Sequence, residues 1–361
     1  MGAPVLPRPY IHVSRGLKND ARRRFVHVHE KEYLHRPLLR GLMVARPMAS
    51  WMSRKLIGAG GWGYFSGGLR SYARAFPFVE VNATFYRRIP ESCARRWRAQ
   101  VPADFVFAVK AHRDVTHGAG LATPVARAAL AHDARLTRIL RAPYLILETP
   151  ARLVFTTEEA AALRDLVSSV DALGRIGLEA RAHARGPLPA PLASTLRDLD
   201  VLDVVDLSRQ SPRVEDDVVY TRIFGKGSHN LYEFTDQELQ DLDRSRRDAV
   251  EVTFAFHGVR MYRDAARFLT FKRTGAFPQA RSVIGLDSLA ERLREDACFP
   301  STRDELLRDH GWKVIDLDPS TRVHADRLLA RLPRGRFGDV DAVIRALARP
   351  DPDVPEGPRP R

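Results

Sequence analysis

Charged and hydrogen-bonding side chains follow the apolar runs of this chain at regular intervals between Lys55 and Gly258. Carboxylates and histidines exchange protons, whereas lysine and arginine bind anions. The strands of a parallel barrel point their carboxyl ends at one face, so side chains that follow such strands meet there. We therefore expect a set of these residues to converge around one cavity at one rim: Glu80, Lys110, Glu148, Glu179, Arg181, Asp206, Arg222 and His257.

The residue types in this set suggest a chemical role for each residue at such a rim. Glu179 and Glu148 are candidates for proton transfer, and His117 and His257 belong to the type that titrates near neutral pH. The cations Lys110, Arg181 and Arg222 would bind an anionic group. The remaining predicted ligand-binding residues are Trp62, Glu80, Asn82, Tyr86 and Asp206.

Glu179 and Arg181 have the i, i+2 spacing that places two side chains on the same face of a strand. The alternative interpretation of the whole set is structural. Parallel barrels also bury ion-pair networks that only fix the interior, because a buried charge needs a partner.

Metal and dinucleotide chemistry receive little support from the sequence. One alternative has His257 and Glu148 sharing one ion, but without a His-x-His pair on a predicted strand we predict no metal site, and the cofactor stays unknown. The run Gly58-Ala59-Gly60-Gly61-Trp62-Gly63 matches a dinucleotide fingerprint. However, Trp62 occupies the place where the backbone should approach a pyrophosphate, and two further glycines delay the next helix. We interpret the run as a turn that carries an aromatic wall.

The elements that would position these residues form eight β-then-α units, which predict an α/β fold: a closed parallel (β/α)8 TIM-type barrel. Strands are expected near residues 55–59, 78–83, 105–110, 143–149, 175–181, 201–207, 218–224 and 251–257. Helices are expected near 69–76, 91–99, 124–140, 157–172, 190–199, 235–248 and 261–273, with little room for one after the sixth strand. Thr235 and Glu238 have the spacing of a capping box.

The sequence divides into three parts. Residues 1–50 are a basic tail without a sustained period, which we expect to be disordered. Residues 51–275 hold the barrel. Residues 276–361 are a small helical appendix with expected helices from Phe299, over Arg322 to Leu332 and over Asp339 to Leu347, followed by a proline-rich end.

The net charge of +14 is unevenly distributed. Residues 1–55 hold 12 Lys and Arg against 3 Asp and Glu, whereas residues 56–275 hold 31 against 26. The charge is therefore weak support for a nucleic-acid partner. Two cysteines exclude a disulfide framework, and we expect a cytoplasmic protein without a membrane segment.

Several spaced motifs resemble the YecE-like family, catalogued as domain of unknown function 72. They are Ile57 to Tyr64, Val79 to Arg87, Phe105 to Lys110 with Thr116-His117, Leu178 to His183, and Tyr220 to Gly225. The resemblance covers about residues 56–275 and implies a TIM-type barrel of unestablished activity. This sequence departs from the family pattern at two places. It has Glu148 where the family usually has Gln, and His257-Gly258 where the family usually has Asn-Asn. More loosely, residues 296–347 resemble domain of unknown function 2795.

Three functions remain open. The first is binding of a small anionic or polyhydroxylated ligand at the mouth of the barrel, with possible acid/base catalysis. The second is a nucleic-acid-binding or nuclease-like barrel, which rests on fold analogy alone. The third is a metabolite-sensing module without catalysis. The sequence does not settle whether the protein is an enzyme.

Overall fold

A computed structural model describes residues 53–227, 230–280 and 283–349. The predicted tail, residues 1–50, and the proline-rich end after Arg349 lie outside these described residues. Eight parallel strands form one sheet in the order β6-β5-β4-β3-β2-β1-β8-β7. The strands are β1 (Arg54–Ala59), β2 (Phe78–Val81), β3 (Val106–Lys110), β4 (Tyr144–Glu148), β5 (Arg175–Glu179), β6 (Leu202–Asp203), β7 (Val218–Ile223) and β8 (Glu251–Phe256).

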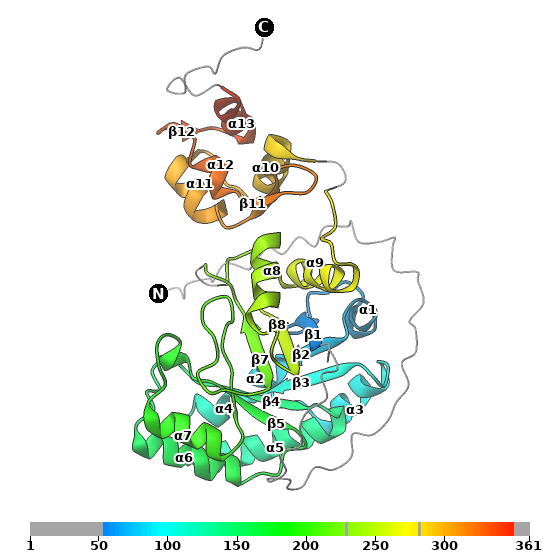
Figure 1. The fold of residues 1–361 in the computed structure, drawn as a ribbon, viewed down its shortest axis with the longest axis vertical. Coiled ribbons are helices and arrows are strands. Elements are labelled where there is room, and N and C mark those ends of the chain that lie inside the picture. Colours follow the sequence, from blue (N-terminus) through cyan, green and yellow to red (C-terminus); the bar gives the residue numbers. More distant parts are fainter. Residues whose placement is uncertain (1–52, 228–229, 281–282, 350–361) are drawn as a thin grey trace, which may run out of the picture.

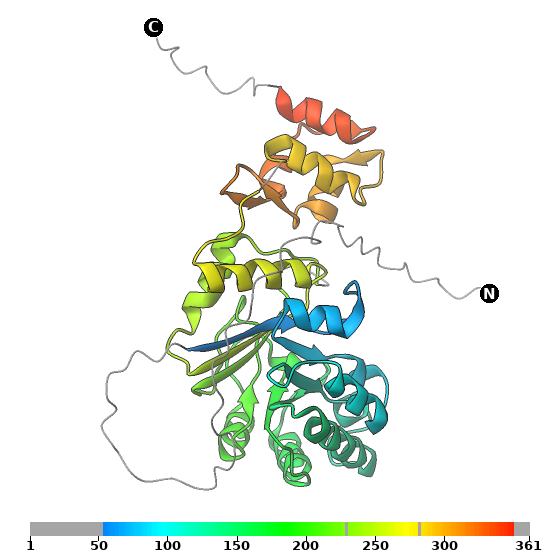
Figure 2. The same cartoon turned by 90° about the vertical axis from the view of Figure 1, so that its right-hand side faces the viewer.

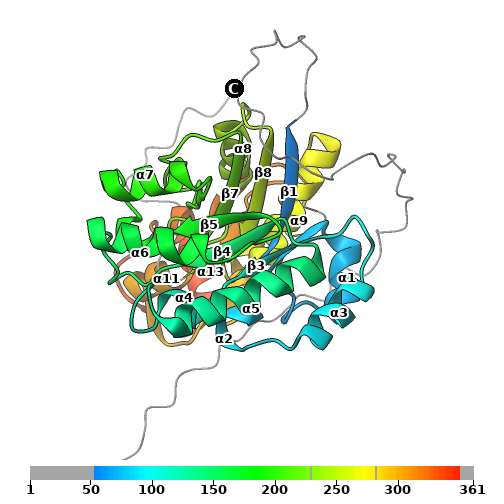
Figure 3. The ribbon, with the colours of Figure 1, turned by 90° about the horizontal axis from the view of Figure 1, so that it is seen from below.

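Helices alternate with these strands and lie outside them (Figures 1 and 3). They are α1 (Gly68–Ala75), α2 (Ala83–Tyr86), α3 (Glu91–Ala99), α4 (Arg113–Thr116), α5 (Pro124–Leu140), α6 (Thr157–Ser168), α7 (Ala190–Asp198), α8 (Asp236–Ser245) and α9 (Met261–Thr274). The capping box predicted at Thr235 and Glu238 begins α8. Between β6 and β7 the structure has no helix in the residues it describes, as the short spacing predicted. The TIM-type barrel is confirmed.

The sheet closes on itself between β6 and β7 through one bridge, which pairs Val205 with Thr221. The hydroxyl of Thr221 donates to the carbonyl oxygen of Val205 at 2.8 Å and accepts from the backbone N–H of Leu207 at 3.1 Å. A side chain therefore supplements the backbone ladder where β6 is only two residues long. This seam brings the ends of β6 and β7 to the same face as the other strand ends.

Side chains that point into the barrel form layers, as strand alternation requires. An apolar layer in the middle includes Phe78, Ala108, Ile146, Val204, Tyr220 and Ala255. The position two residues further along each of these strands carries a polar side chain instead: Glu80, Lys110, Glu148, Asp206, Arg222 and His257. The carboxyl end of the barrel is consequently lined with charged side chains, and the apolar layer fills the barrel interior next to them.

A separate C-terminal unit follows the barrel and packs beyond α8 and α9 (Figures 1 and 2). It contains α10 (Gly285–Arg294), β9 (Ser301–Thr302), α11 (Arg303–His310), β10 (Val314–Asp316), β11 (Arg322–His324), α12 (Asp326–Leu329), β12 (Arg336–Phe337) and α13 (Val340–Ala348). The helix predicted over Arg322 to Leu332 is wrong in its first part. Residues 322–324 pair with β10 as an antiparallel strand, so only the short α12 remains helical.

A hydrogen bond and ion pairs join this unit to the barrel. Buried Glu233, before α8, accepts from the backbone N–H of Val314 at 2.9 Å and lies 3.8 Å from Arg292 of α10. Arg322 of β11 pairs with Asp236 of α8 at 2.8 Å. No helix within the described part of the chain has the length and apolar character to cross a membrane.

Candidate functional site

Arg222, at the end of β7, is the centre of the charged layer. Its side chain is only 2% exposed, and its guanidinium contacts carboxylates from three other strands. The group lies 3.2 Å from Glu80 of β2 and 2.5 Å from Glu148 of β4, and it also contacts Glu179 of β5. One arginine therefore holds three of the predicted carboxylates at one point.

Two further cations complete the charge balance on the β3 to β5 side. Lys110 Nζ lies 2.8 Å from Glu148 Oε2 and 3.8 Å from the centre of the Phe85 ring. Arg181 lies 3.1 Å from Glu148 and 3.2 Å from Glu179. The Arg181 side chain is 39% exposed and that of Glu179 is 16% exposed, so these two members of the network reach solvent.

On the opposite side, Glu80 contacts two groups besides Arg222. His257 Nε2 lies 3.2 Å from Glu80 Oε1, and the Tyr220 hydroxyl donates to Glu80 Oε2 at 2.9 Å. The His257 ring stacks on Phe224 with ring centres 5.0 Å apart. Gly60 leaves room for that ring, because a Cβ there would lie 2.2 Å from His257 Cε1.

These contacts determine the protonation states. Burial opposes ionisation of Glu148, but Arg222, Lys110 and Arg181 outweigh it and lower its pKa to about 2. Burial likewise opposes ionisation of Glu80, yet Arg222, His257 and Lys110 hold its pKa well below the usual range. Burial and then Arg222 lower the pKa of His257. At neutral pH Glu80 and Glu148 are thus ionised and His257 is neutral.

His117 lies at the edge of this network, at the C-terminus of α4. Its ring packs edge-on against Phe85 with centres 5.0 Å apart, and its Nδ1 lies 2.9 Å from the Thr116 hydroxyl. Burial lowers the pKa of His117, with Lys110 and Arg181 acting in the same direction against Glu148. The imidazole is therefore neutral at pH 7.

Four predicted site residues stand outside the network. Asp206 accepts from the backbone N–H groups of Phe224 and Gly225 at 3.0 and 3.1 Å, so its carboxylate holds the loop after β7. Trp62 packs edge-on against Trp97, Asn82 precedes α2, and Tyr86 is 64% exposed. Their predicted roles in ligand binding remain predictions.

One local detail of the expectation is wrong. Arg181 does not share a strand with Glu179, because β5 ends at Glu179 and a short 3₁₀ helix begins at Arg181. Thr149 Oγ1 accepts from the backbone N–H of Arg181 at 3.1 Å and so directs this turn. The long arginine side chain still reaches back to Glu179, which is why the two residues meet.

Sequence reasoning missed Tyr220 and Thr116 as parts of the site. Tyr220 lies in an apolar run and resembles a core aromatic residue, although its i, i+2 spacing to Arg222 placed it on the inward face. The Thr116 hydroxyl donates to the carbonyl oxygen of Glu148, a contact between distant segments that no local pattern indicates.

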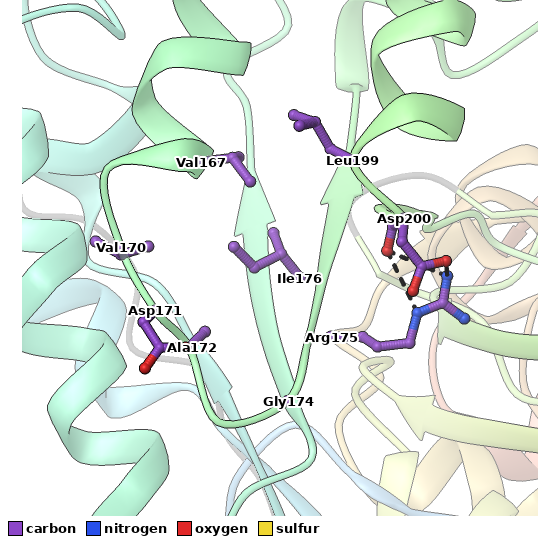
Figure 4. A pocket seen from close by; sticks show the side chains of 9 residues that line it. All are labelled: Val167, Val170, Asp171, Ala172, Gly174, Arg175, Ile176, Leu199 and Asp200. Atoms are coloured by element: carbon purple, nitrogen blue, oxygen red, sulfur yellow. Dashed lines mark hydrogen bonds and ion pairs between the residues drawn. The ribbon is translucent and has the colours of Figure 1, made fainter. Parts of the chain in front are cut away.

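Possible metal ligands and pockets are the remaining features of the described residues. Over residues 53–227, 230–280 and 283–349, no group of three or more His, Cys, Asp or Glu is placed to hold a metal ion. A pocket of about 240 Å³ is lined by Asp171, Gly174, Arg175, Asp200 and apolar neighbours (Figure 4). It lies at the start of β5, the opposite end of the strand from Glu179, so it is not the predicted cavity at the mouth.

Comparisons with known proteins agree with this architecture. A DUF72 family protein from Enterococcus faecalis V583 superposes with a TM-score of 0.50 at 16% identity, covering 61% of this chain and 94% of its own. One from Thermotoga maritima MSB8 has a TM-score of 0.46 at 18% identity, covering 61% and 99%. A D-psicose 3-epimerase has a TM-score of 0.38 at 12% identity, covering 60% and 98%, which is too distant to support an argument.

At these identities the solved structures show the fold alone. A search of curated proteins found no match. The profile of the family described as "Protein of unknown function DUF72" matches residues 49–278, the part of the chain that forms the barrel. The resemblance seen in the sequence motifs is thereby confirmed, and this chain belongs to the DUF72 family.

Proposed function

We propose that the protein binds a small anionic or polyhydroxylated molecule at the carboxyl-end mouth of the barrel, with acid/base chemistry available beside it. The observation that carries the proposal is the exposure of Arg181 and Glu179, at 39% and 16%, within an otherwise buried network. A guanidinium binds carboxylate or phosphate oxygens, and a carboxylate accepts from hydroxyl groups. The two side chains would therefore meet different groups of one ligand.

The buried members of the network would fix the geometry of the two exposed residues. Arg222 and Lys110 neutralise Glu148, so that Arg181 can leave Glu148 for a ligand without stranding that carboxylate. Asn82 Oδ1 is buried and finds no hydrogen-bond partner among the described residues, so it offers an acceptor for a ligand hydroxyl.

Proton transfer would fall to Glu179 and His117. Glu148 was the other predicted candidate, but its pKa of about 2 makes it a poor acid and a weak base at neutral pH. His257 is buried between Glu80, Arg222 and Phe224, which leaves it a supporting contact. His117 is the neutral imidazole at the edge of the site.

A nucleic-acid ligand is the weaker proposal. The positive excess lies mainly in residues 1–55, and the network at the mouth has three carboxylates for three cations. A neutral cluster gives little attraction for a polyphosphate chain. Steep salt dependence of DNA or RNA binding that survives removal of residues 1–52 would favour the nucleic-acid proposal instead.

Titration calorimetry on the full chain tests the main proposal, with D-gluconate, D-glucose and inorganic phosphate as probes. We expect at least one probe to bind. Arg181→Gln should weaken an anionic probe by about tenfold or more, because hydrogen bonds to charged groups contribute about 1.5–3 kcal/mol. Arg197→Gln, an exposed arginine near the C-terminus of α7, is the matched control.

Two results would overturn the proposal: no heat from any probe, or equal affinity of wild type and Arg181→Gln for an anionic probe. Binding without turnover would support a sensing module at the same site. Chemical conversion of a bound probe that is lost in Glu179→Gln, but kept in the exposed control Glu291→Gln, would support an enzyme.

A further inference from the structure

The two ring nitrogens of His117 have different surroundings. Nδ1 lies 2.9 Å from the hydroxyl oxygen of Thr116. For Nε2, no hydrogen-bond partner exists in the part of the chain that the structure describes. The edge-on packing against Phe85 fixes the plane of the ring, with an interplanar angle of 86°. The imidazole is thus held from one side and open on the other.

The Thr116 hydroxyl has a single proton, and the backbone already uses it. Thr116 Oγ1 donates that proton to the carbonyl oxygen of Glu148, at the end of β4. Thr116 is buried, so water does not compete for the contact. The hydroxyl oxygen must then accept a hydrogen bond from His117, which requires the ring proton on Nδ1 in the neutral imidazole. Nε2 is left with the free lone pair.

We infer that Thr116 is a positioning residue that holds His117 in the Nδ1-protonated tautomer, so that Nε2 is the base that accepts a proton from a ligand hydroxyl. The transfer breaks the O–H bond of the ligand and forms an N–H bond at Nε2. The negative charge left on the ligand oxygen would be stabilised by Arg181, the exposed guanidinium of the mouth. For its ligand, this inference rests on the proposed function.

The charged groups around His117 favour a neutral base. Burial lowers its pKa first, Glu148 of β4 raises it, and Lys110 of β3, Arg181 and Arg152 lower it further. The base is therefore present at pH 7 and is lost as the pH falls through the lowered pKa. An imidazolium would also donate from Nε2 and would have no lone pair for a proton.

Nitrogen-15 NMR of the full chain, labelled at histidine and without any ligand, tests the inference at pH 8. The signals of His117 are assigned as those that disappear in His117→Gln. We expect a pyrrole-like shift at Nδ1 and a pyridine-like shift at Nε2. Thr116→Ser keeps the hydroxyl and should keep this pattern. Thr116→Val should lower the ratio of the Nδ1-protonated to the Nε2-protonated tautomer about fivefold, because one ordinary hydrogen bond is lost.

Thr270→Val is the control, since Thr270 in α9 also donates to a backbone carbonyl, at 2.9 Å, and should leave the His117 signals unchanged. A pyridine-like Nδ1 in the wild type would overturn the inference, as would an unchanged pattern in Thr116→Val. If Thr116→Val does not fold, the wild-type and Thr116→Ser spectra decide. A failure of every probe to bind in calorimetry concerns the proposed function and leaves the tautomer assignment standing.

Discussion

Replacing Arg222 with glutamine removes the cation that three carboxylates share. Glu80, Glu148 and Glu179 contact its guanidinium, whose side chain is 2% exposed. Breaking a buried ion pair costs about 3–5 kcal/mol, because the remaining charge stays buried without its partner. We expect Arg222→Gln to lose at least this much free energy of unfolding at pH 7.5. For a domain of the barrel's size, that corresponds to a fall in Tm of about 6–20 °C.

The loss should depend on pH in a definite direction. In the wild type, the pKa values of Glu80 and Glu148 are lowered, so these groups stabilise the fold above their unfolded values and lose that effect only in acid. In Arg222→Gln, burial is no longer opposed by that cation, so the folded state retains protons more readily. The difference in Tm from wild type should therefore shrink as the pH falls from 7.5 to 5.

Calorimetric melting of the full chain measures both effects. Arg138→Gln is the control, because Arg138 forms an exposed ion pair with Asp171, at 48% and 95% side-chain exposure, and should cost under about 1 kcal/mol. Adding Glu80→Gln to Arg222→Gln should recover part of the loss. A Tm within about 2 °C of wild type, or a loss that is the same at pH 5 and 7.5, would refute the electrostatic account.

Three further changes test other parts of the structure. Gly60→Ala should lower the free energy of unfolding by about 1–3 kcal/mol, because its Cβ would lie 2.2 Å from His257 Cε1. Gly63→Ala is the control, since a Cβ there meets nothing within 4 Å. Equal Tm values for the two variants would contradict this packing. Burial raises the pKa of Asp133 to about 7, so the folded state binds a proton there that the unfolded state loses at about pH 4. The stabilisation from this bound proton is lost as the pH rises from about 4 to 7. Asp133→Asn should therefore gain stability over wild type across that range in urea titrations, and a constant difference would rule this out. Glu233→Gln weakens the contacts of Glu233 with Val314 and Arg292 of the C-terminal unit and should speed hydrogen exchange in β10 and β11 about tenfold, the loss of one hydrogen bond to a charged group; exchange rates equal to wild type would contradict this.

The strand ends and their polar residues were predictable because inward positions in a barrel alternate with period two. Phe78 precedes Glu80 and Ala108 precedes Lys110 on the same face, and this spacing is visible in the sequence. The choice of ion-pair partners was not predictable. The sequence allows each of three cations to pair with each carboxylate, and only the depth of Arg222 in the closed barrel makes it the shared partner.

Two details could not be read from the sequence, for reasons of long-range structure. Asp206 follows its strand like the other polar residues, and its carboxylate accepts from a backbone N–H group after β7, a contact that no local pattern indicates. Residues 322–324 have no local signal that opposes a helix, and only their pairing with Val314–Asp316 makes them a strand. Contacts between distant segments decide both cases.

The seam between β6 and β7 is joined by fewer paired backbone residues than the other strand pairs of the barrel. A single bridge at Val205 and Thr221 joins the two strands there, whereas β5 and β6 share two paired residues and β7 and β8 share six. Chain ends are best tolerated where few backbone contacts are lost. A circular permutant with its new chain ends within residues 208–217 would interrupt none of the eight strands and only the connection at this seam. We therefore expect new chain ends to be tolerated best between β6 and β7.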